Sequence, residues 1–360
     1  MLADFLYGLH EQYSIFNVFR YITFRSAYAA ITAFLLSLLL GPWAIAQLRA
    51  RGVVKHVRNE GPDSHQSKTG TPTMGGLLIL AAITFSTLLW ADLSNAEVRM
   101  ALGVTLALGA IGFLDDYLQV VRKQNRGLVG RAKIVGQVVI GLVVGFTVLQ
   151  LVPRESATAT TVPFLKERML DLGWLYIPFV VFVLTGASNA VNLTDGLDGL
   201  AIGVIVFAAV AFAVLSYLSG HSRFAEYLQI LYLPGAGQLA IFCSSIFGAA
   251  LGFLWYNAHP AEVFMGDTGS LSLGGALGIV AILLKMEIIF AIVGGVFVAE
   301  ALSVILQVAS FRLTGRRIFR MAPIHHHFEL LGWAESKVVV RFWIIAGLFA
   351  LLSLSTLKIR

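Results

Sequence analysis

Apolar residues occur in ten long runs along the chain, and polar segments separate these runs. A helix needs about 20 mostly apolar residues to cross the hydrocarbon core of a membrane. The pattern therefore predicts an all-α, polytopic integral membrane protein of about ten transmembrane helices, organised as one transmembrane domain over residues 1–360. The runs cover residues 25–48, 73–91, 97–114, 134–152, 173–188, 199–219, 237–256, 269–284, 287–308 and 338–357.

Composition strengthens the membrane interpretation. Hydrophobic residues make up 58% of the chain and charged residues only 13%, and the mean hydropathy is +0.81. Soluble domains carry about 25% charged residues, so an ordinary soluble enzyme is excluded. The single cysteine, Cys243, rules out an intramolecular disulfide and a cysteine-based metal site. No small-residue cleavage site follows the first apolar run, which is expected to remain as a span.

Basic residues are distributed unevenly between the runs. The alternate segments 49–72, 115–133, 189–198, 257–268 and 309–337 contain fifteen Lys and Arg residues, and the remaining segments contain five. Cytoplasmic loops of membrane proteins are enriched in Lys and Arg. The first set is therefore expected to face the cytoplasm, and both termini the opposite side. The acidic, amide and histidine motifs also fall in the first set, which predicts one site on the cytoplasmic face.

An acidic pair, Asp115 and Asp116, stands at the predicted end of the third span. Two adjacent carboxylates near a low-dielectric medium repel each other, and a bound divalent cation or a proton relieves that repulsion. The alternative is that the pair only marks the membrane boundary. We interpret it as a candidate catalytic or metal site.

A second polar motif runs from Asn189 to Leu200. Within it, Asn192, Asp195 and Asp198 recur every three residues, which in a helix places them on one face. Oxygen ligands of this kind suit Mg²⁺. The alternative is a turn that Asx hydrogen bonds stabilise.

A third motif, from Phe264 to Ser270, contains a carboxylate flanked by glycines. Asp267 precedes an apolar helix, where it either caps the helix or holds a metal while backbone amides receive phosphate. Nearby Asn257 offers a further polar contact.

Three consecutive histidines, His325, His326 and His327, follow Pro323. A Zn²⁺ site is conceivable, but the usual His or Cys partners are missing. Hydrogen bonding to a diphosphate or a sugar is the favoured interpretation.

Lysines supply the cations that a phosphate ligand needs. Lys68, Lys123 and Lys133 are the candidates, although membrane topology and attraction to anionic lipid also explain basic loops. Carboxylates for Mg²⁺, cations for phosphate and imidazoles for hydrogen bonds together favour phosphoryl transfer, which depends on positioning and charge neutralisation. The residues thus predict a Mg²⁺-dependent transferase acting on a lipid phosphate. A transporter is the alternative from another class, but it predicts charges near span centres, where Glu300 is the main example.

These motifs resemble a known family. The Asp115–Asp116 pair, the stretch from Asn189 to Leu200 and the stretch from Phe264 to Ser270 resemble the polyprenyl-phosphate N-acetylhexosamine-1-phosphate transferase superfamily. The segments 58–76 and 316–329 resemble its phospho-N-acetylmuramoyl-pentapeptide transferase branch. One departure is Gln119, which stands where a third aspartate would follow in prenyl synthases.

The resemblance implies a reaction and its participants. UDP-N-acetylmuramoyl-pentapeptide would give its phospho-sugar to undecaprenyl phosphate, forming lipid I and UMP in the first membrane step of peptidoglycan synthesis. It further implies a Mg²⁺ cofactor, a homodimer in the bacterial inner membrane among membrane lipids, and no nucleic-acid partner. A sister transferase of N-acetylglucosamine 1-phosphate is the nearest alternative, and the histidine run argues against it.

The resemblance and the motifs also assign residues. Asp115 is expected to act as a base on the lipid phosphate, Asp267 to bind Mg²⁺ directly, and Asp116 to help place the metal; an aspartate nucleophile is the alternative mechanism. The expected catalytic residues are Asp115, Asp116, Asp267 and His325. The expected substrate-binding residues are Lys68, Thr73, Lys123, Lys133, Asn189, Asn192, Asp195, Asp198, Asn257, Phe264, His326 and His327.

Overall fold

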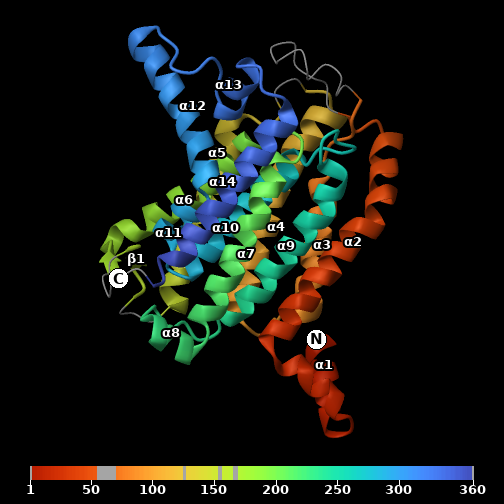
Figure 1. The fold of residues 1–360 in the computed structure, drawn as a ribbon, viewed down its shortest axis with the longest axis vertical. Coiled ribbons are helices and arrows are strands. Elements are labelled where there is room, and N and C mark those ends of the chain that lie inside the picture. Colours follow the sequence, from red (N-terminus) through yellow and green to blue (C-terminus); the bar gives the residue numbers. More distant parts are fainter. Residues whose placement is uncertain (1, 55–69, 125–126, 153–155, 165–168, 359–360) are drawn as a thin grey trace.

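A computed structural model describes residues 2–54, 70–124, 127–152, 156–164 and 169–358 of the chain. Helices make up nearly all of its regular structure (Figure 1). The α-helices are α1 (Leu2–Gly8), α2 (Ile22–Ala50), α3 (Gly76–Trp90), α4 (Ala96–Asp116), α5 (Gly130–Leu151), α6 (Tyr176–Thr194), α7 (Leu200–Ser219), α8 (Ser222–Leu228), α9 (Gly237–Asn257), α10 (Gly266–Leu283), α11 (Glu287–Val293), α12 (Gly295–Thr314), α13 (Ile324–Leu330) and α14 (Glu335–Ser355).

Shorter elements join these helices. The 3₁₀ helices are η1 (Leu9–Glu11), η2 (Ser14–Arg20) and η5 (Gly173–Leu175), and a π-helical turn, η4 (Tyr117–Val121), continues α4. The strands β1 (Ala159–Thr161) and β2 (Met169–Asp171) pair antiparallel, with Thr160 opposite Leu170.

Nine helices of the described chain are long and apolar enough to cross a membrane. A tenth apolar helix, α3, has 15 residues and is shorter than a full span. Each of the ten predicted runs coincides with a helix or a pair of helices, so the prediction of an all-α, polytopic membrane protein is confirmed. Cys243 is a buried, free cysteine in α9, as its place in an apolar run predicts.

Two predicted boundaries are wrong. The run 287–308 is not one helix, because the chain breaks at Gly294 between α11 and α12. The fifth span does not end at residue 188, because α6 continues to Thr194 and includes Asn189 and Asn192. Both errors arise because apolar content locates a membrane segment but does not register a helix break or a polar final turn.

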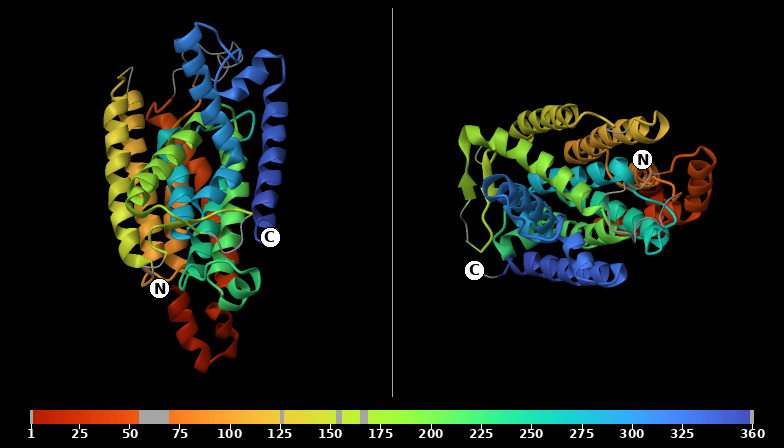
Figure 2. Two further views of the ribbon diagram at one scale, coloured as in Figure 1. Left: turned by 90° about the vertical axis from the view of Figure 1, so that its left-hand side faces the viewer. Right: turned by 90° about the horizontal axis from the view of Figure 1, so that it is seen from above.

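The helix α10 forms the centre of the bundle. Within the most apolar 18-residue segment of each helix, 94% of the residues of α10 are buried, compared with 28% for α5 and 22% for α12. It packs against α3, α4, α6 and α7. In the end-on view of Figure 2, α5 and α14 lie on opposite sides of the bundle. The first turn of α10 is consequently surrounded by the ends of its neighbours.

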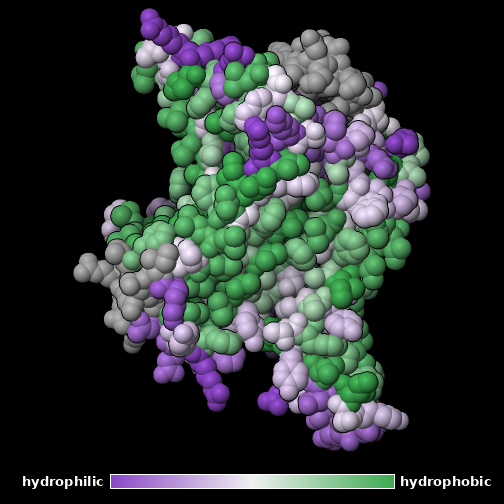
Figure 3. All heavy atoms as spheres, viewed as in Figure 1, coloured by the Kyte–Doolittle hydropathy of each residue, from purple (hydrophilic) through white to green (hydrophobic). Residues whose placement is uncertain are grey.

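The bundle has an apolar middle and two polar ends. In Figure 3 apolar side chains cover the middle of the visible face, and hydrophilic ones gather toward the upper and lower ends. The helix α13 lies at the upper end, whereas α1, α8, the β1–β2 hairpin and both chain ends lie toward the lower end (Figure 1). This band is what a multi-pass membrane protein requires, because lipid solvates apolar side chains directly.

Candidate active site

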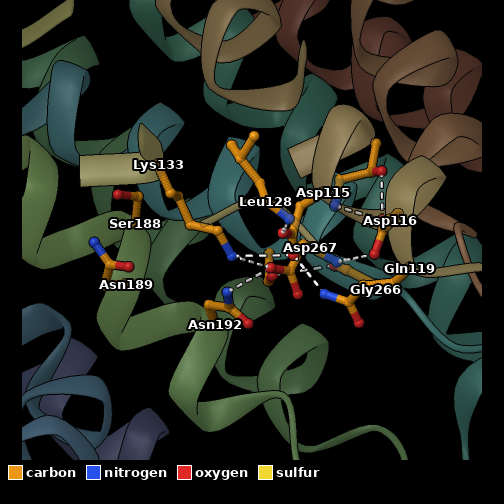
Figure 4. A network of polar contacts seen from close by, with 12 residues as sticks. Asp115, Asp116, Gln119, Leu128, Lys133, Ser188, Asn189, Asn192, Gly266 and Asp267 are labelled. Atoms are coloured by element: carbon orange, nitrogen blue, oxygen red, sulfur yellow. Dashed lines mark hydrogen bonds and ion pairs between the residues drawn. The ribbon is translucent and has the colours of Figure 1, made fainter. Parts of the chain in front are cut away.

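Three side chains from separate helices meet beside the first turn of α10. Asp115 comes from the last turn of α4, Lys133 from the first turn of α5 and Asp267 from α10 (Figure 4). Lys133 Nζ lies 3.1 Å from Asp115 Oδ2 and 2.6 Å from Asp267 Oδ2. The ammonium group therefore bridges two carboxylates that are distant in sequence.

The end of α6 adds an amide to this group. Asn192 Nδ2 donates to Asp267 Oδ2 at 3.2 Å, so that oxygen accepts from both Asn192 and Lys133. Asn189 lies on the same face of α6, three residues earlier. The extension of α6 through Thr194 is what carries both amides to the site.

Asp115 is held by three donors. Its Oδ1 accepts from the backbone N–H of Leu128 at 2.7 Å, and its Oδ2 accepts from Gln119 at 2.7 Å and from Lys133. Gln119 lies in the π-helical turn η4, a helix irregularity that is frequent at functional sites. Because an ionised carboxylate has about four acceptor positions, Asp115 keeps about one, and the Asp267 carboxyl group also lies within hydrogen-bond distance of Asp115.

Asp116 points in a different direction from its neighbour. Its Oδ1 accepts from the backbone N–H of Asp267 at 3.1 Å, and its Oδ2 accepts from the backbone N–H and the hydroxyl of Thr268 at 2.9 and 2.6 Å. A carboxylate at a helix N-terminus satisfies unpaired N–H groups and interacts favourably with the helix dipole. Asp116 thus fixes the first turn of α10, the turn that presents Asp267.

Two glycines allow this close packing. A Cβ on Gly112 of α4 would lie 2.2 Å from the backbone oxygen of Asp267, and one on Gly266 would lie 2.7 Å from Asp116 Oδ2. Gly266 also has a φ of +74°, which a side chain would strain. A larger residue at Gly112 would meet the backbone of α10, and one at Gly266 would displace the Asp116 carboxylate.

The donor set of the site suits a hard divalent cation. Mg²⁺ binds through one or two carboxylates and keeps its remaining positions for water and phosphate oxygens. Asp115 and Asp267 already direct one oxygen each to a shared cation, the ammonium of Lys133. The residues therefore fit a metal, with Asp267 the more accessible carboxylate because its side chain is 22% exposed and that of Asp115 is 2% exposed.

The loop before α10 is anchored to the segment before α3. Phe264 N donates to Pro72 O, and the N–H groups of Gly75 and Gly76 donate to the carbonyls of Phe264 and Met265. Thr73, in the same segment, is buried. The structure therefore joins the segment that contains Thr73 to the loop that contains Phe264, and their role in substrate binding stays a prediction.

A second acidic group lies behind the α6–α7 turn. Asp198 Oδ2 lies 3.1 Å from His259 Nδ1, which is 3.6 Å from Glu335 Oε2, and one ligand atom of each residue lies within 4.8 Å of the others. Asn257 uses its amide on the backbone of Gly199 and Val263. The expectation that Asn192, Asp195 and Asp198 share one helix face is therefore wrong, because α6 ends at Thr194 and Asp198 turns to another set of partners.

The three histidines also diverge. His325 is fully buried, with its Nδ1 3.1 Å from Glu300 Oε2, and its Nε2 lies against Gly196. His326 contacts Glu329 at 2.7 Å, whereas His327 accepts from the backbone N–H of Arg320. Among the described contacts the three imidazoles share no common partner. His325 lies against Gly196 in the turn that follows α6, and its ring contacts that of His326.

Comparison with known proteins places this arrangement in a family. The family model described as Glycosyl transferase family 4 matches residues 98–285, and the phospho-N-acetylmuramoyl-pentapeptide-transferase signature 1 matches residues 68–80. A phospho-N-acetylmuramoyl-pentapeptide-transferase of Syntrophus aciditrophicus is 56% identical over 361 residues, and one of Desulforapulum autotrophicum is 55% identical over 361 residues; both comparisons cover 100% of each chain. The chain belongs to the phospho-N-acetylmuramoyl-pentapeptide-transferase family.

For this member of the phospho-N-acetylmuramoyl-pentapeptide-transferase family, several substrate contacts expected from the sequence stay predictions. Lys123 is exposed, and no described contact joins it to the carboxylates. Asp195 closes α6, where its N–H donates to Val191 O. Lys68 lies outside the described residues.

Sequence reasoning missed several polar residues that serve the site. Gln119 holds Asp115, and Gln137, buried in the fourth predicted span, contacts Ser188 and Asn189. Both glutamines stand four residues from a predicted site residue, Asp115 and Lys133 respectively. A search for polar residues at that helical spacing would have identified them.

Proposed function

We propose that the protein transfers phospho-N-acetylmuramoyl-pentapeptide from UDP-N-acetylmuramoyl-pentapeptide to undecaprenyl phosphate, with formation of lipid I and UMP. The relatives carry the name of this activity over the full length of the chain. The structural observation that supports it best is the Lys133 ammonium between Asp115 and Asp267. A site with two carboxylates and a cation at one end of an apolar bundle suits a phosphorylated lipid substrate.

In this proposal the lipid phosphate oxygen attacks the β-phosphorus of the nucleotide sugar. The bond from that phosphorus to the bridging oxygen breaks, and UMP leaves with the bond's electron pair. Asp115 accepts a proton from the lipid phosphate at its remaining acceptor position. Because Gln119 and Leu128 hold its carboxylate, Asp115 presents that position in a fixed direction.

Asp267 is the proposed principal metal ligand. Mg²⁺ bound there would neutralise charge on the diphosphate. Lys133 contributes a second positive charge, and Asn192 orients the Asp267 carboxylate. Asp116, proposed from sequence to help place the metal, would do so by holding the first turn of α10.

Histidines and loop residues complete the proposed substrate site. His325 would support the loop after Asn192, and His326 and His327 would contact the sugar or diphosphate. Thr73, Phe264, Asp195, Asp198 and Asn257, with Lys68 and Lys123, would form the surrounding binding surface. These assignments rest on the family resemblance.

We further propose that the protein lies in the bacterial inner membrane as a homodimer, with the α13 end in the cytoplasm and both termini in the periplasm. The excess of Lys and Arg in the loops of that end supports this orientation. Cysteine labelling in intact cells at Arg131→Cys and at Trp174→Cys tests it. We expect an impermeant reagent to label position 174 and not position 131. Labelling of position 131 alone would indicate the opposite orientation.

The activity is tested with purified protein, undecaprenyl phosphate and Mg²⁺. UMP and a lipid-linked sugar are expected in equal amounts with UDP-N-acetylmuramoyl-pentapeptide and not with UDP-N-acetylglucosamine. A reversed preference would identify the sister transferase instead. If labelled UMP exchanged into the nucleotide sugar in the absence of lipid, the reaction would proceed through a covalent aspartyl intermediate and not by direct attack.

A further inference from the structure

A polar network extends from the candidate active site along the interface of α5 and α6. Gln137 lies on α5 one turn after Lys133 and is only 1% exposed. Its Nε2 donates to Ser188 Oγ at 3.1 Å, and its Oε1 accepts from Asn189 Nδ2 at 2.8 Å. In the view of Figure 4, Ser188 and Asn189 lie on the Lys133 side of the Asp115–Asp267 pair. A buried amide is costly unless hydrogen bonds satisfy it, and here both of its polar atoms have partners.

The backbone carbonyl of Thr185 fixes the direction of these hydrogen bonds. A carbonyl oxygen only accepts, so the Asn189 amide atom that lies 2.8 Å from it must be the nitrogen. The same nitrogen donates its second hydrogen to Gln137 Oε1. Both N–H groups of Asn189 are therefore used inside the bundle.

The carbonyl oxygen of Asn189 is the amide atom that remains for a ligand. Asn189 is half-buried, and it stands on the same face of α6 as Asn192, which contacts Asp267. In the view of Figure 4 the oxygen is the Asn189 amide atom nearer to Lys133 and Asp267. An acceptor in this place repels a phosphate oxygen and matches a hydroxyl or an N–H group.

We propose that Gln137 is a positioning residue that holds Asn189 as a hydrogen-bond acceptor for the nucleotide-sugar substrate. This inference rests on the proposed function. A nucleotide sugar carries several hydroxyl and amide donors, whereas a polyprenyl phosphate has at most one P–OH group, and the proposed mechanism directs that proton to Asp115. The polarity of Asn189 therefore assigns it to the sugar nucleotide and not to the lipid.

A double-mutant cycle in full-length protein tests this proposal. Gln137→Leu keeps a similar volume and removes one of the two anchors of Asn189. We expect KM for the nucleotide sugar to rise about tenfold, the factor that one ordinary hydrogen bond represents, with kcat and the KM for the lipid unchanged. Asn189→Ala should raise the same KM, and the double variant should match Asn189→Ala, because Gln137 acts through Asn189.

Ser245→Ala is the matched control. Ser245 is a buried polar residue of α9 whose hydroxyl lies within hydrogen-bond distance of Ser86 Oγ in α3 and of Ile241 O in its own helix. The Ser245→Ala substitution should leave both KM values unchanged. Additive effects of the two variants, or a rise in KM for the lipid, would overturn the inference while leaving the proposed function intact. Absence of UMP release by the wild-type protein would overturn the proposed function and the substrate assignment together.

Discussion

Lys133 Nζ lies 2.6 Å from Asp267 Oδ2, although the two residues are 134 positions apart in the chain. The contact joins the start of α5 to the start of α10. Asp115, at the end of α4, lies 3.1 Å from the same nitrogen. Two carboxylates so close to one cation are what phosphoryl transfer needs, because its catalysis is mainly charge neutralisation and positioning.

Asp115→Asn should lower turnover at least about 100-fold, the range expected when a positioned acid–base group is lost. Asparagine preserves the shape of the side chain but cannot accept the proton. The rate of UMP release measures the loss. Binding of Mg²⁺, measured by titration calorimetry, should remain, and a wild-type rate in this variant would remove the base role.

Asp116→Ala should destabilise the protein by about 1–2 kcal/mol, because it removes the cap of α10. It should also lower activity, since the first turn of α10 presents Asp267. Thermal unfolding in detergent and UMP release measure the two effects.

Asn95→Ala is the control for that variant. Asn95 caps the start of α4 by accepting from Val98 N, at the other end of the same helix. Its loss should lower the unfolding temperature by a comparable amount and leave the rate unchanged. Equal losses of activity in both variants would mean that Asp116 acts through stability alone.

Lys133→Met should lower kcat/KM about 10²–10³-fold, as expected for loss of a group that stabilises developing charge. The variant leaves the carboxylates of Asp115 and Asp267 facing each other without their shared cation. Arg131→Met removes an exposed charge two residues earlier on α5 and should change kcat/KM less than about threefold. Similar losses of kcat/KM in both variants would mean that Lys133 contributes only to the overall positive charge of this surface.

Lys285 predicts a pH dependence of stability at the opposite end of the bundle. Burial lowers the pKa of Lys285 to about 8, although its ammonium donates to Ala157 O at 2.6 Å and faces the ring of Tyr176 and the carboxylate of Glu287. The folded state therefore binds the proton less tightly than the unfolded state, whose pKa is about 10.4. Stability should rise as pH increases from about 8 to about 10.4.

Lys285→Met tests this dependence, because methionine fills similar space without a titrating group. The increase of unfolding temperature across that pH window should be lost in the variant. An unchanged slope would assign the effect to other groups.

The sequence predicted the helical membrane fold because runs of apolar residues near the width of a bilayer leave few alternatives. It also predicted Asp115, Asp267, Lys133 and Asn192 as site residues, and the structure brings these four side chains together. Residue type alone was informative here, because ionisable residues within membrane segments are rare and usually pair with one another or line a site.

Other features depend on contacts between distant segments. Asp116 looks equivalent to Asp115 in sequence, and only the approach of α10 assigns it to a helix N-terminus. The separation of Asp198 from Asn192 follows from the end of α6 at Thr194, which the predicted three-residue spacing did not indicate. In the sequence, Glu300 is likewise an isolated charge within an apolar run, and only the fold places His325 beside it.

The rate of UMP release by the wild type, Asp115→Asn, Asp267→Asn and the double variant tests the shared catalytic centre most directly. Each single substitution should lower the rate at least about 100-fold. The double variant should be no slower than the slower single variant, because residues that act as a unit are not additive. Multiplication of the two losses in the double variant would show that Asp115 and Asp267 act independently, and would contradict the account.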